Sequence, residues 1–197
     1  MKRSLEWFKS KGWKPHAFQK ETWQAIADGK SGLLNAPTGY GKTYGVWFGI
    51  IEHALKHPEH KGLHSIWLTP LRALSKEIEH AATVVSDDLN IPYNIGLRTG
   101  DTSPKERQKQ KINTPKSLIS TPETLHLMMS QKGYTDVFKS LEFVVVDEWH
   151  ELLGSKRGVQ IELALSRLKK INPSLKIWGI SATIGNMQEA ANILLGT

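Results

Sequence analysis

The chain has 197 residues, of which 39% are hydrophobic, and this length and composition predict one domain with a buried core and exclude a disordered chain. The absence of cysteine excludes a disulfide framework and any thiolate metal site. A formal charge of +7 favours a polyanionic partner such as nucleic acid, although it also fits a surface charged only for solubility.

The amino-terminal residues are basic but contain no apolar segment, so they do not resemble a secretion signal. No later stretch approaches the roughly 18 consecutive apolar residues that cross a membrane. We therefore expect a cytoplasmic protein with no membrane partner.

Short apolar runs and longer helical patterns alternate along the chain after an amino-terminal helical segment at residues 1–30. The apolar runs predict strands at residues 31–36, 63–69, 93–99, 116–120, 142–147 and 175–181. The helical patterns include GKTYGVWFGIIEHALKH, which Pro58 ends, and LRALSKEIEHAATVVSDDL. The alternation predicts an α/β fold in which a mostly parallel sheet carries helices on both faces.

Residues 99–116 form a basic stretch that we expect to be a loop. The chain shows no internal repeat, no low-complexity tract and no linker rich in proline or serine. A single domain over residues 1–197 is the simplest interpretation.

The first predicted strand leads into APTGYGKT, which fits the phosphate-loop pattern if Ala36 replaces the first glycine. Gly39 and Gly41 would allow a tight turn whose N–H groups face phosphate oxygens. Lys42 would neutralise the β- and γ-phosphates, and the Thr43 hydroxyl would bind Mg²⁺. The alternative is an ordinary glycine-rich turn between a strand and a helix.

Two carboxylates, Asp147 and Glu148, follow the buried run FVVV. A nucleoside triphosphate site needs a carboxylate at the end of a neighbouring strand to hold Mg²⁺, and Asp147 has that position. Glu148 would act as the general base that activates the attacking water. The alternative, two acids that merely end a strand, is less favoured because both motifs occur in the expected order.

Five short strings, taken in their order along the chain, give a specific resemblance to a known family. APTGYGKT, TPLRAL, TPET, DEWH and SAT occur in the order of motifs I, Ia, Ib, II and III of superfamily 2 helicases, and RTGDT resembles an additional nucleic-acid motif. The longer strings FQKETW and VVVDEWHELLGSKRGVQIELALSRL resemble the bacterial ligase-associated DExH-box helicases, a branch of the Lhr-type proteins. The resemblance covers nearly the whole chain and implies a RecA-like P-loop NTPase domain that uses ATP and Mg²⁺.

The resemblance also implies the roles of individual residues at the nucleotide site. Asp147 and Thr43 would bind Mg²⁺, Lys42 the phosphates, and Glu148 the catalytic water. Gln19 resembles the Q-motif glutamine, whose amide can both donate to and accept from adenine, although it also fits a polar helix face. The predicted nucleotide-binding residues are Gln19, Pro37, Thr38, Gly39, Tyr40, Gly41, Lys42 and Thr43.

Two more groups of residues receive roles from the resemblance. His150, Ser181 and Thr183 would couple the nucleotide site to the nucleic-acid site, although each could simply end a strand. The predicted nucleic-acid contacts are Arg72, Thr99, Gly100, Asp101, Thr121 and Pro122. Such groups grip phosphates without reading bases. Lys156 and Arg157, in a basic loop after the DExH box, would add a further contact or remain solvated.

Three histidines, His53, His57 and His60, lie close together in the sequence EHALKHPEHKG. Because Pro58 ends the helix and histidines near a helix carboxyl end are favoured by the dipole, we do not expect them to bind a metal.

The resemblance implies the first motor domain of an ATP-dependent DNA helicase or translocase in DNA repair, with single-stranded or tailed DNA, a DNA ligase and a nuclease as partners. The second RecA-like domain, with its arginine finger, is absent from these 197 residues, so we expect little hydrolysis or unwinding by this chain alone. The alternatives are an RNA helicase domain and a nucleic-acid-binding module without motor activity.

Overall fold

The six apolar runs form the strands of one sheet in a computed structural model that describes residues 2–182 and 184–196. The strands are β1 (Gly32–Asn35), β2 (Ser65–Leu68), β3 (Ile95–Arg98), β4 (Ser117–Ser120), β5 (Phe143–Val146) and β6 (Lys176–Ser181). Their order across the sheet is β1-β6-β5-β2-β4-β3, and every neighbouring pair is parallel. All six predicted strands and the parallel α/β fold are therefore confirmed.

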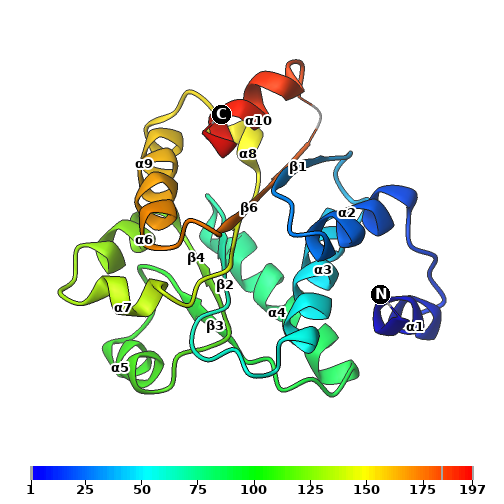
Figure 1. Cartoon of the computed structure of the whole chain (residues 1–197), viewed down its shortest axis with the longest axis horizontal. Helices are drawn as coiled ribbons and strands as arrows, with labels where there is room; N and C mark the ends of the chain where they lie inside the picture. The colour runs from blue at the N-terminus through cyan, green and yellow to red at the C-terminus, as the bar shows by residue number, and fades with distance from the viewer. Residues whose placement is uncertain (1, 183, 197) are drawn as a thin grey trace.

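Helices connect the strands and cover both faces of the sheet, as Figure 1 shows. The helices before β4 are α1 (Lys2–Ser10), α2 (Ala17–Ala27), α3 (Lys42–Lys56), α4 (Arg72–Asp88) and α5 (Pro104–Ile112). Those after it are α6 (Pro122–Met129), α7 (Tyr134–Phe138), α8 (Trp149–Leu152), α9 (Lys156–Ile171) and α10 (Met187–Leu195). Within the part of the chain that the structure describes, no helix is both long and apolar enough to cross a membrane.

Side chains that alternate along each strand separate two hydrophobic cores. In β2, Ile66 and Leu68 join the core beneath α6, α9 and α10, whereas Trp67 joins the core beneath α1 to α4. Both faces of the strand are therefore buried, which explains the nearly continuous apolar runs in the sequence.

Helices α2 and α3 pack closely because two glycines remove side chains from their interface. A Cβ on Gly49 would collide with Ile26 of α2, and one on Gly45 would lie 3.6 Å from Gln19 Cγ of α2 and 3.0 Å from Leu34 Cδ2 of β1. The amino-terminal segment is thus packed against the helix that follows the phosphate loop.

Residues 104–112 form helix α5, so the expectation of a loop throughout residues 99–116 is wrong. Ser103 caps this helix by accepting from Glu106 N at 3.2 Å, and Pro104 occupies its first turn. Only Gln110 of the helix is buried, so its sequence lacks the apolar periodicity that would predict a helix.

Lys156 and Arg157 also lie in a helix and not in the expected loop. Ser155 caps α9 by accepting from Gly158 N at 3.1 Å, which places both basic residues in the first turn.

Candidate functional site

The sequence motifs gather at the carboxyl edge of the sheet, because each follows a parallel strand. The phosphate loop, the SAT motif and the carboxylate pair follow β1, β6 and β5, which are neighbours. The motifs TPLRAL, TPET and RTGDT follow β2, β4 and β3, the other half of the sheet. The strand order therefore places the motifs predicted to bind nucleotide in one half of this edge, the nucleotide half, and those predicted to bind nucleic acid in the other, the nucleic-acid half.

The phosphate loop turns between β1 and α3 on two glycines with positive φ. Gly39 has φ +83° and Gly41 φ +73°, a region that other residues rarely adopt. Lys42 begins α3, and its Nζ donates to the carbonyl oxygens of Ala36 at 2.7 Å and Pro37 at 3.0 Å. The loop thus wraps around the lysine ammonium at the start of a helix, an arrangement suited to phosphate.

The other predicted residues of the loop differ in exposure. Pro37, Thr38 and Tyr40 are exposed at its surface, and Thr43 is half-buried in the first turn of α3. A ligand that enters over the loop would meet these exposed groups first.

Gln19 lies beneath the phosphate loop with only 1% of its surface exposed. Its Nε2 donates to Gly41 O at 2.9 Å, and its Oε1 accepts from His16 N at 2.8 Å. A Cβ on Gly41 would lie 2.9 Å from Gln19 Nε2, which gives a second reason for glycine there. Gln19 therefore positions the loop, and its contact with adenine stays a prediction.

Aromatic side chains lie beside the loop. Tyr40 is 51% exposed, and its ring centroid lies 5.6 Å from that of His16, which stacks on Phe18 at 5.5 Å. Trp13 is also 51% exposed and lies 6.3 Å from Tyr44. These rings offer flat surfaces beside the loop for a nucleobase.

Asp147 is 5% exposed and accepts two hydrogen bonds. Trp67 Nε1 donates to its Oδ2 at 3.1 Å, and Glu148 N donates to its Oδ1 at 2.9 Å. Burial, aided by the charge of Glu148, raises the pKa of Asp147 to about 6, although the Trp67 bond and Lys42 oppose this shift. A bound cation would therefore favour the ionised carboxylate strongly.

Glu148 has a left-handed backbone with φ +51° and ψ +42°, which costs a non-glycine residue about 1 kcal/mol. Its Oε2 lies 3.4 Å from His150 Nδ1, and the same Nδ1 lies 3.3 Å from Ala182 N. His150 thus connects the carboxylate pair to the SAT motif.

Ser181 ends β6 fully buried, and its hydroxyl donates to Ala182 O at 2.9 Å. It pairs in register with Asn35, the last residue before the phosphate loop. Thr183, the third predicted coupling residue, lies outside the described residues.

Arg72 and Asp101, from the predicted nucleic-acid residues, form an ion pair. Arg72 Nη1 donates to Asp101 Oδ1 at 2.8 Å, and both side chains are exposed. A Cβ on Gly100 would lie 2.9 Å from Arg72 Nη2, so glycine allows the arginine to cross this turn. Thr99 is buried, and its Oγ1 accepts from Asp101 N at 3.3 Å.

Thr121 and Pro122 are buried at the start of α6, where Thr121 Oγ1 accepts from Thr124 N at 3.4 Å. The neighbouring Glu123 accepts from Arg157 Nε at 2.6 Å. Arg157 Nη1 also donates to Pro70 O at 3.2 Å, so one arginine joins the loop after β2 to the first turn of α6, which follows β4.

Sequence reasoning missed Trp67, Glu123 and Arg107 at this edge. Arg107 Nη2 donates to Gly100 O at 3.0 Å from α5, the helix that was not predicted. Trp67 occupies the strand next to Asp147, so knowledge of the strand order would have revealed it.

The fold and the phosphate loop define a RecA-like P-loop nucleotide-binding domain. The sequence profile of the DEAD/DEAH box helicase family matches residues 16–190. The chain therefore belongs to the DEAD/DEAH box helicase family.

Lhr-type helicases are similar over nearly the whole chain. The Lhr helicase/probable uracil glycosylase of Mycolicibacterium smegmatis is 34% identical over 97% of this chain, and the Lhr-Core helicase of Sulfolobus acidocaldarius is 34% identical over 96%. The chain spans 14% and 23% of those two proteins. A structure of Mycobacterium smegmatis Lhr bound to ssDNA and AMP-PNP superimposes with a TM-score of 0.84 and 31% identity, over 99% of this chain and 26% of that one.

Proposed function

We propose that this chain is the ATP-binding first motor domain of an ATP-dependent DNA helicase or translocase. One observation carries the proposal: the nucleotide motifs and the nucleic-acid motifs occupy adjacent halves of a single sheet edge. His150 lies within that edge and contacts both Glu148 and the SAT motif. The two halves meet where β5 pairs with β2, so nucleotide binding and nucleic-acid binding can affect one another over a short distance.

The nucleotide contacts follow from the phosphate loop. The N–H groups at the start of α3 and the Lys42 ammonium bind the phosphates, and the exposed rings of Tyr40 and Trp13 pack on the base. Asp147 and Thr43 would supply oxygen ligands, which suit Mg²⁺. Because the Asp147 carboxylate is buried, a bound cation would compensate its negative charge. When bound, Mg²⁺ neutralises phosphate charge.

Glu148 serves as the general base for the attacking water. Its left-handed backbone lies just after β5, and its carboxylate lies 3.4 Å from His150 Nδ1. Backbone strain of this kind concentrates at functional sites, and hydrogen bonds on both sides hold it here.

His150 provides the coupling through its single Nδ1. When this atom carries a proton it donates to Glu148, and when it carries a lone pair it accepts from Ala182 N–H. The two hydrogen bonds cannot form at the same time, because one nitrogen either donates or accepts. A change in the hydrogen bonding of Glu148 therefore alters the hydrogen bond to the SAT motif.

Efficient hydrolysis also requires an arginine from a second RecA-like domain, whose loss costs on the order of 10³ to 10⁵ in rate in related phosphoryl-transfer enzymes. The chain covers 14% and 23% of the two Lhr-type proteins, whose remaining length can hold such a second domain. This chain alone is then expected to bind nucleotide weakly and to unwind nothing.

The single-stranded DNA in the Lhr structure supports DNA as the polymer. A role in DNA repair, a DNA ligase and a nuclease as partners, and a cytoplasmic location belong to the same proposal and rest on the family resemblance. An RNA substrate would use similar phosphate contacts, so it must be tested directly.

The test is titration of a fluorescent ATP analogue with and without Mg²⁺, in the presence of matched single-stranded DNA or RNA. We expect Mg²⁺-dependent binding that Lys42→Ala abolishes and that DNA strengthens more than RNA does. Nucleic-acid affinity that responds neither to ATP nor to Lys42→Ala would instead identify a binding module without motor function.

A further inference from the structure

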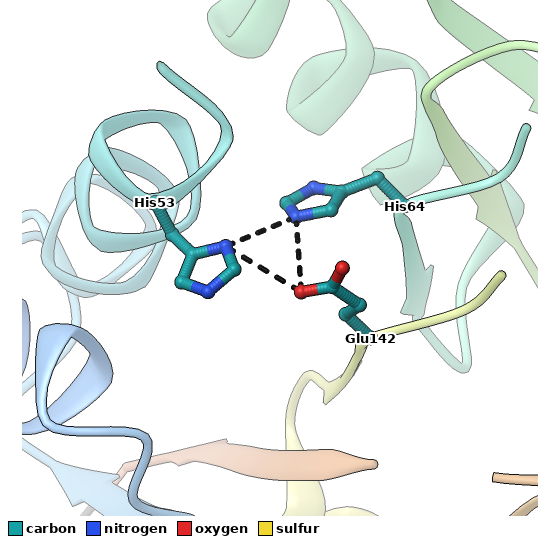
Figure 2. A group of neighbouring side chains, drawn as sticks. All are labelled: His53, His64 and Glu142. Carbon is teal, nitrogen blue, oxygen red and sulfur yellow. Dashed lines mark hydrogen bonds and ion pairs between the residues drawn. The ribbon is translucent and has the colours of Figure 1, made fainter. Parts of the chain in front are cut away.

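A second group of side chains converges at the opposite, amino edge of the sheet. His53 lies in the last turn of α3, His64 immediately precedes β2, and Glu142 immediately precedes β5. Figure 2 shows one nitrogen of each imidazole directed at the other and at one carboxylate oxygen. We propose that His53, His64 and Glu142 form a zinc-binding site.

The distances between the three atoms suit one metal ion. His53 Nδ1 lies 3.3 Å from His64 Nε2 and 3.6 Å from Glu142 Oε2, and His64 Nε2 lies 3.8 Å from the same oxygen. Ligands on a tetrahedral Zn²⁺ with bonds of 2.0–2.1 Å are separated by about 3.4 Å. Two imidazoles and one carboxylate with a fourth position open to water form a known class of zinc site.

A hydrogen-bond chain fixes the His64 ring in the form that binds a metal. Ser65 Oγ donates to Ser117 Oγ at 2.8 Å, so Tyr93 OH, 3.1 Å away, donates to Ser65 Oγ. The Tyr93 oxygen is then free to accept from His64 Nδ1 at 2.8 Å. His64 Nε2 is left with its lone pair, and an outer hydrogen bond of this kind is typical of metal-bound histidines.

Electrostatics also favour a cation here. Among the described residues, the ion-pair partners of Glu142 are the imidazoles of His53, His60 and His64. Burial lowers the pKa of His53 and lowers that of His64 to about 3. Zn²⁺ would place positive charge beside the Glu142 carboxylate without a proton on either of these rings. Lys116, which donates to His60 O nearby, weakens this preference without removing it.

The ligands come from rigid elements. Glu142 N donates to His64 O at 3.0 Å, and the strands that follow them are paired at Ser65 and Phe143. The metal would therefore join the carboxyl end of α3 to the start of two central strands. Because little rearrangement is needed, binding should be strong for a site with three ligands.

His57 provides a matched control. It is a helix neighbour of His53, with ring centroids 4.6 Å apart, but its Nδ1 faces Glu59 Oε1 at 3.5 Å and not the cluster. Its replacement removes one imidazole from the same segment and leaves the three proposed ligands intact.

The experiment is calorimetric titration of the chelator-treated chain with ZnCl₂, together with thermal unfolding. We expect one equivalent to bind and the Tm to rise by about 5–10 °C at a zinc concentration about 100 times Kd. Glu142→Gln and His53→Gln should each weaken binding by at least about tenfold, whereas His57→Gln should leave it within about twofold. Circular dichroism in chelator will establish that each variant is folded.

Two results would overturn the proposal. The first is no saturable binding by the folded chain at about 100 μM zinc. The second is equal affinity in Glu142→Gln, His53→Gln and His57→Gln, which would indicate nonspecific capture by the exposed histidines.

Discussion

At the two edges of the sheet, burial shifts the pKa of a proposed metal ligand in opposite directions. At the carboxyl edge, burial raises the pKa of Asp147 to about 6, so its ionised form is less favoured than that of an exposed aspartate. At the amino edge, burial lowers the pKa of His64 to about 3, so the ring stays neutral and keeps a lone pair. Burial thus acts on both groups by disfavouring their charged forms, which weakens the negative charge of a carboxylate but keeps an imidazole in the neutral form that binds metals.

The proposed site residues themselves also differ in backbone conformation. Glu148 has a left-handed backbone, whereas left-handed glycines occur near both groups, Gly39 and Gly41 in the phosphate loop and Gly62 before His64. His53, His64 and Glu142 instead extend from the end of a helix and the starts of two strands. This difference is expected if residues at the carboxyl edge must move during a reaction cycle, whereas those at the amino edge only bind a metal ion.

The largest effect should come from Glu148→Gln, tested in a protein that includes a second RecA-like domain. Loss of the general base should lower ATP hydrolysis by about 10² to 10⁴ while nucleotide binding persists. Glu151→Gln, one turn further along α8, is the control and should change hydrolysis little. Equal losses in both variants would remove Glu148 from its proposed role.

The next effect is a pH dependence of stability at Asp147. Its raised pKa means that ionisation destabilises the metal-free fold, so stability present below about pH 4 is lost as pH rises through about 6. The loss amounts to at most about 3 kcal/mol. The free energy of unfolding of Asp147→Asn, measured in urea against pH, should lack this decline even if the variant is less stable at every pH. An identical pH dependence of stability in both proteins would contradict the raised pKa of Asp147.

A smaller effect should separate two adjacent tryptophans. Trp67→Phe removes the N–H that bonds Asp147, so it should raise the pKa of Asp147 further and weaken Mg²⁺ binding several-fold near pH 6.5. Trp47 packs against Trp67 with ring centroids 6.1 Å apart, and its Nε1 has no hydrogen-bond partner within the described chain. Trp47→Phe should therefore leave Mg²⁺ affinity nearly unchanged in the same titration.

The smallest effect concerns the partly exposed Arg157–Glu123 pair. Arg157→Gln should lower the free energy of unfolding by only about 0.2–1 kcal/mol, because such pairs contribute little. Arg157 also joins the loop after β2 to the first turn of α6, and both carry predicted nucleic-acid motifs. The free energy of nucleic-acid binding should therefore fall by more than the free energy of unfolding. A large loss of stability would show that this arginine mainly supports the fold.

Much of the fold could be predicted because parallel strands buried on both faces leave continuous apolar runs. The phosphate loop and the carboxylate pair were equally visible, since their chemistry depends on residues adjacent in sequence. Helix α5 was missed because it buries only Gln110 and therefore has no apolar stripe. The roles assigned to the site residues stay predictions.

The histidine cluster could not be predicted from spacing. The sequence places His53, His57 and His60 close together, but of these three only His53 belongs to the observed cluster. His53 meets His64 and Glu142 because β2 and β5 are adjacent in the sheet. Strand order is a property of the whole fold, so local patterns do not reveal this group.

The packing of the amino-terminal helices against α3 bears on where this folding unit begins. The family profile starts at residue 16, yet Trp7 and Phe8 of α1 are each only 3% exposed. Their rings pack on Tyr44 and Phe48 of α3, the helix that begins at Lys42. A fragment cut at the profile boundary would uncover this aromatic layer, so packing includes α1 in the domain although the family profile begins after it.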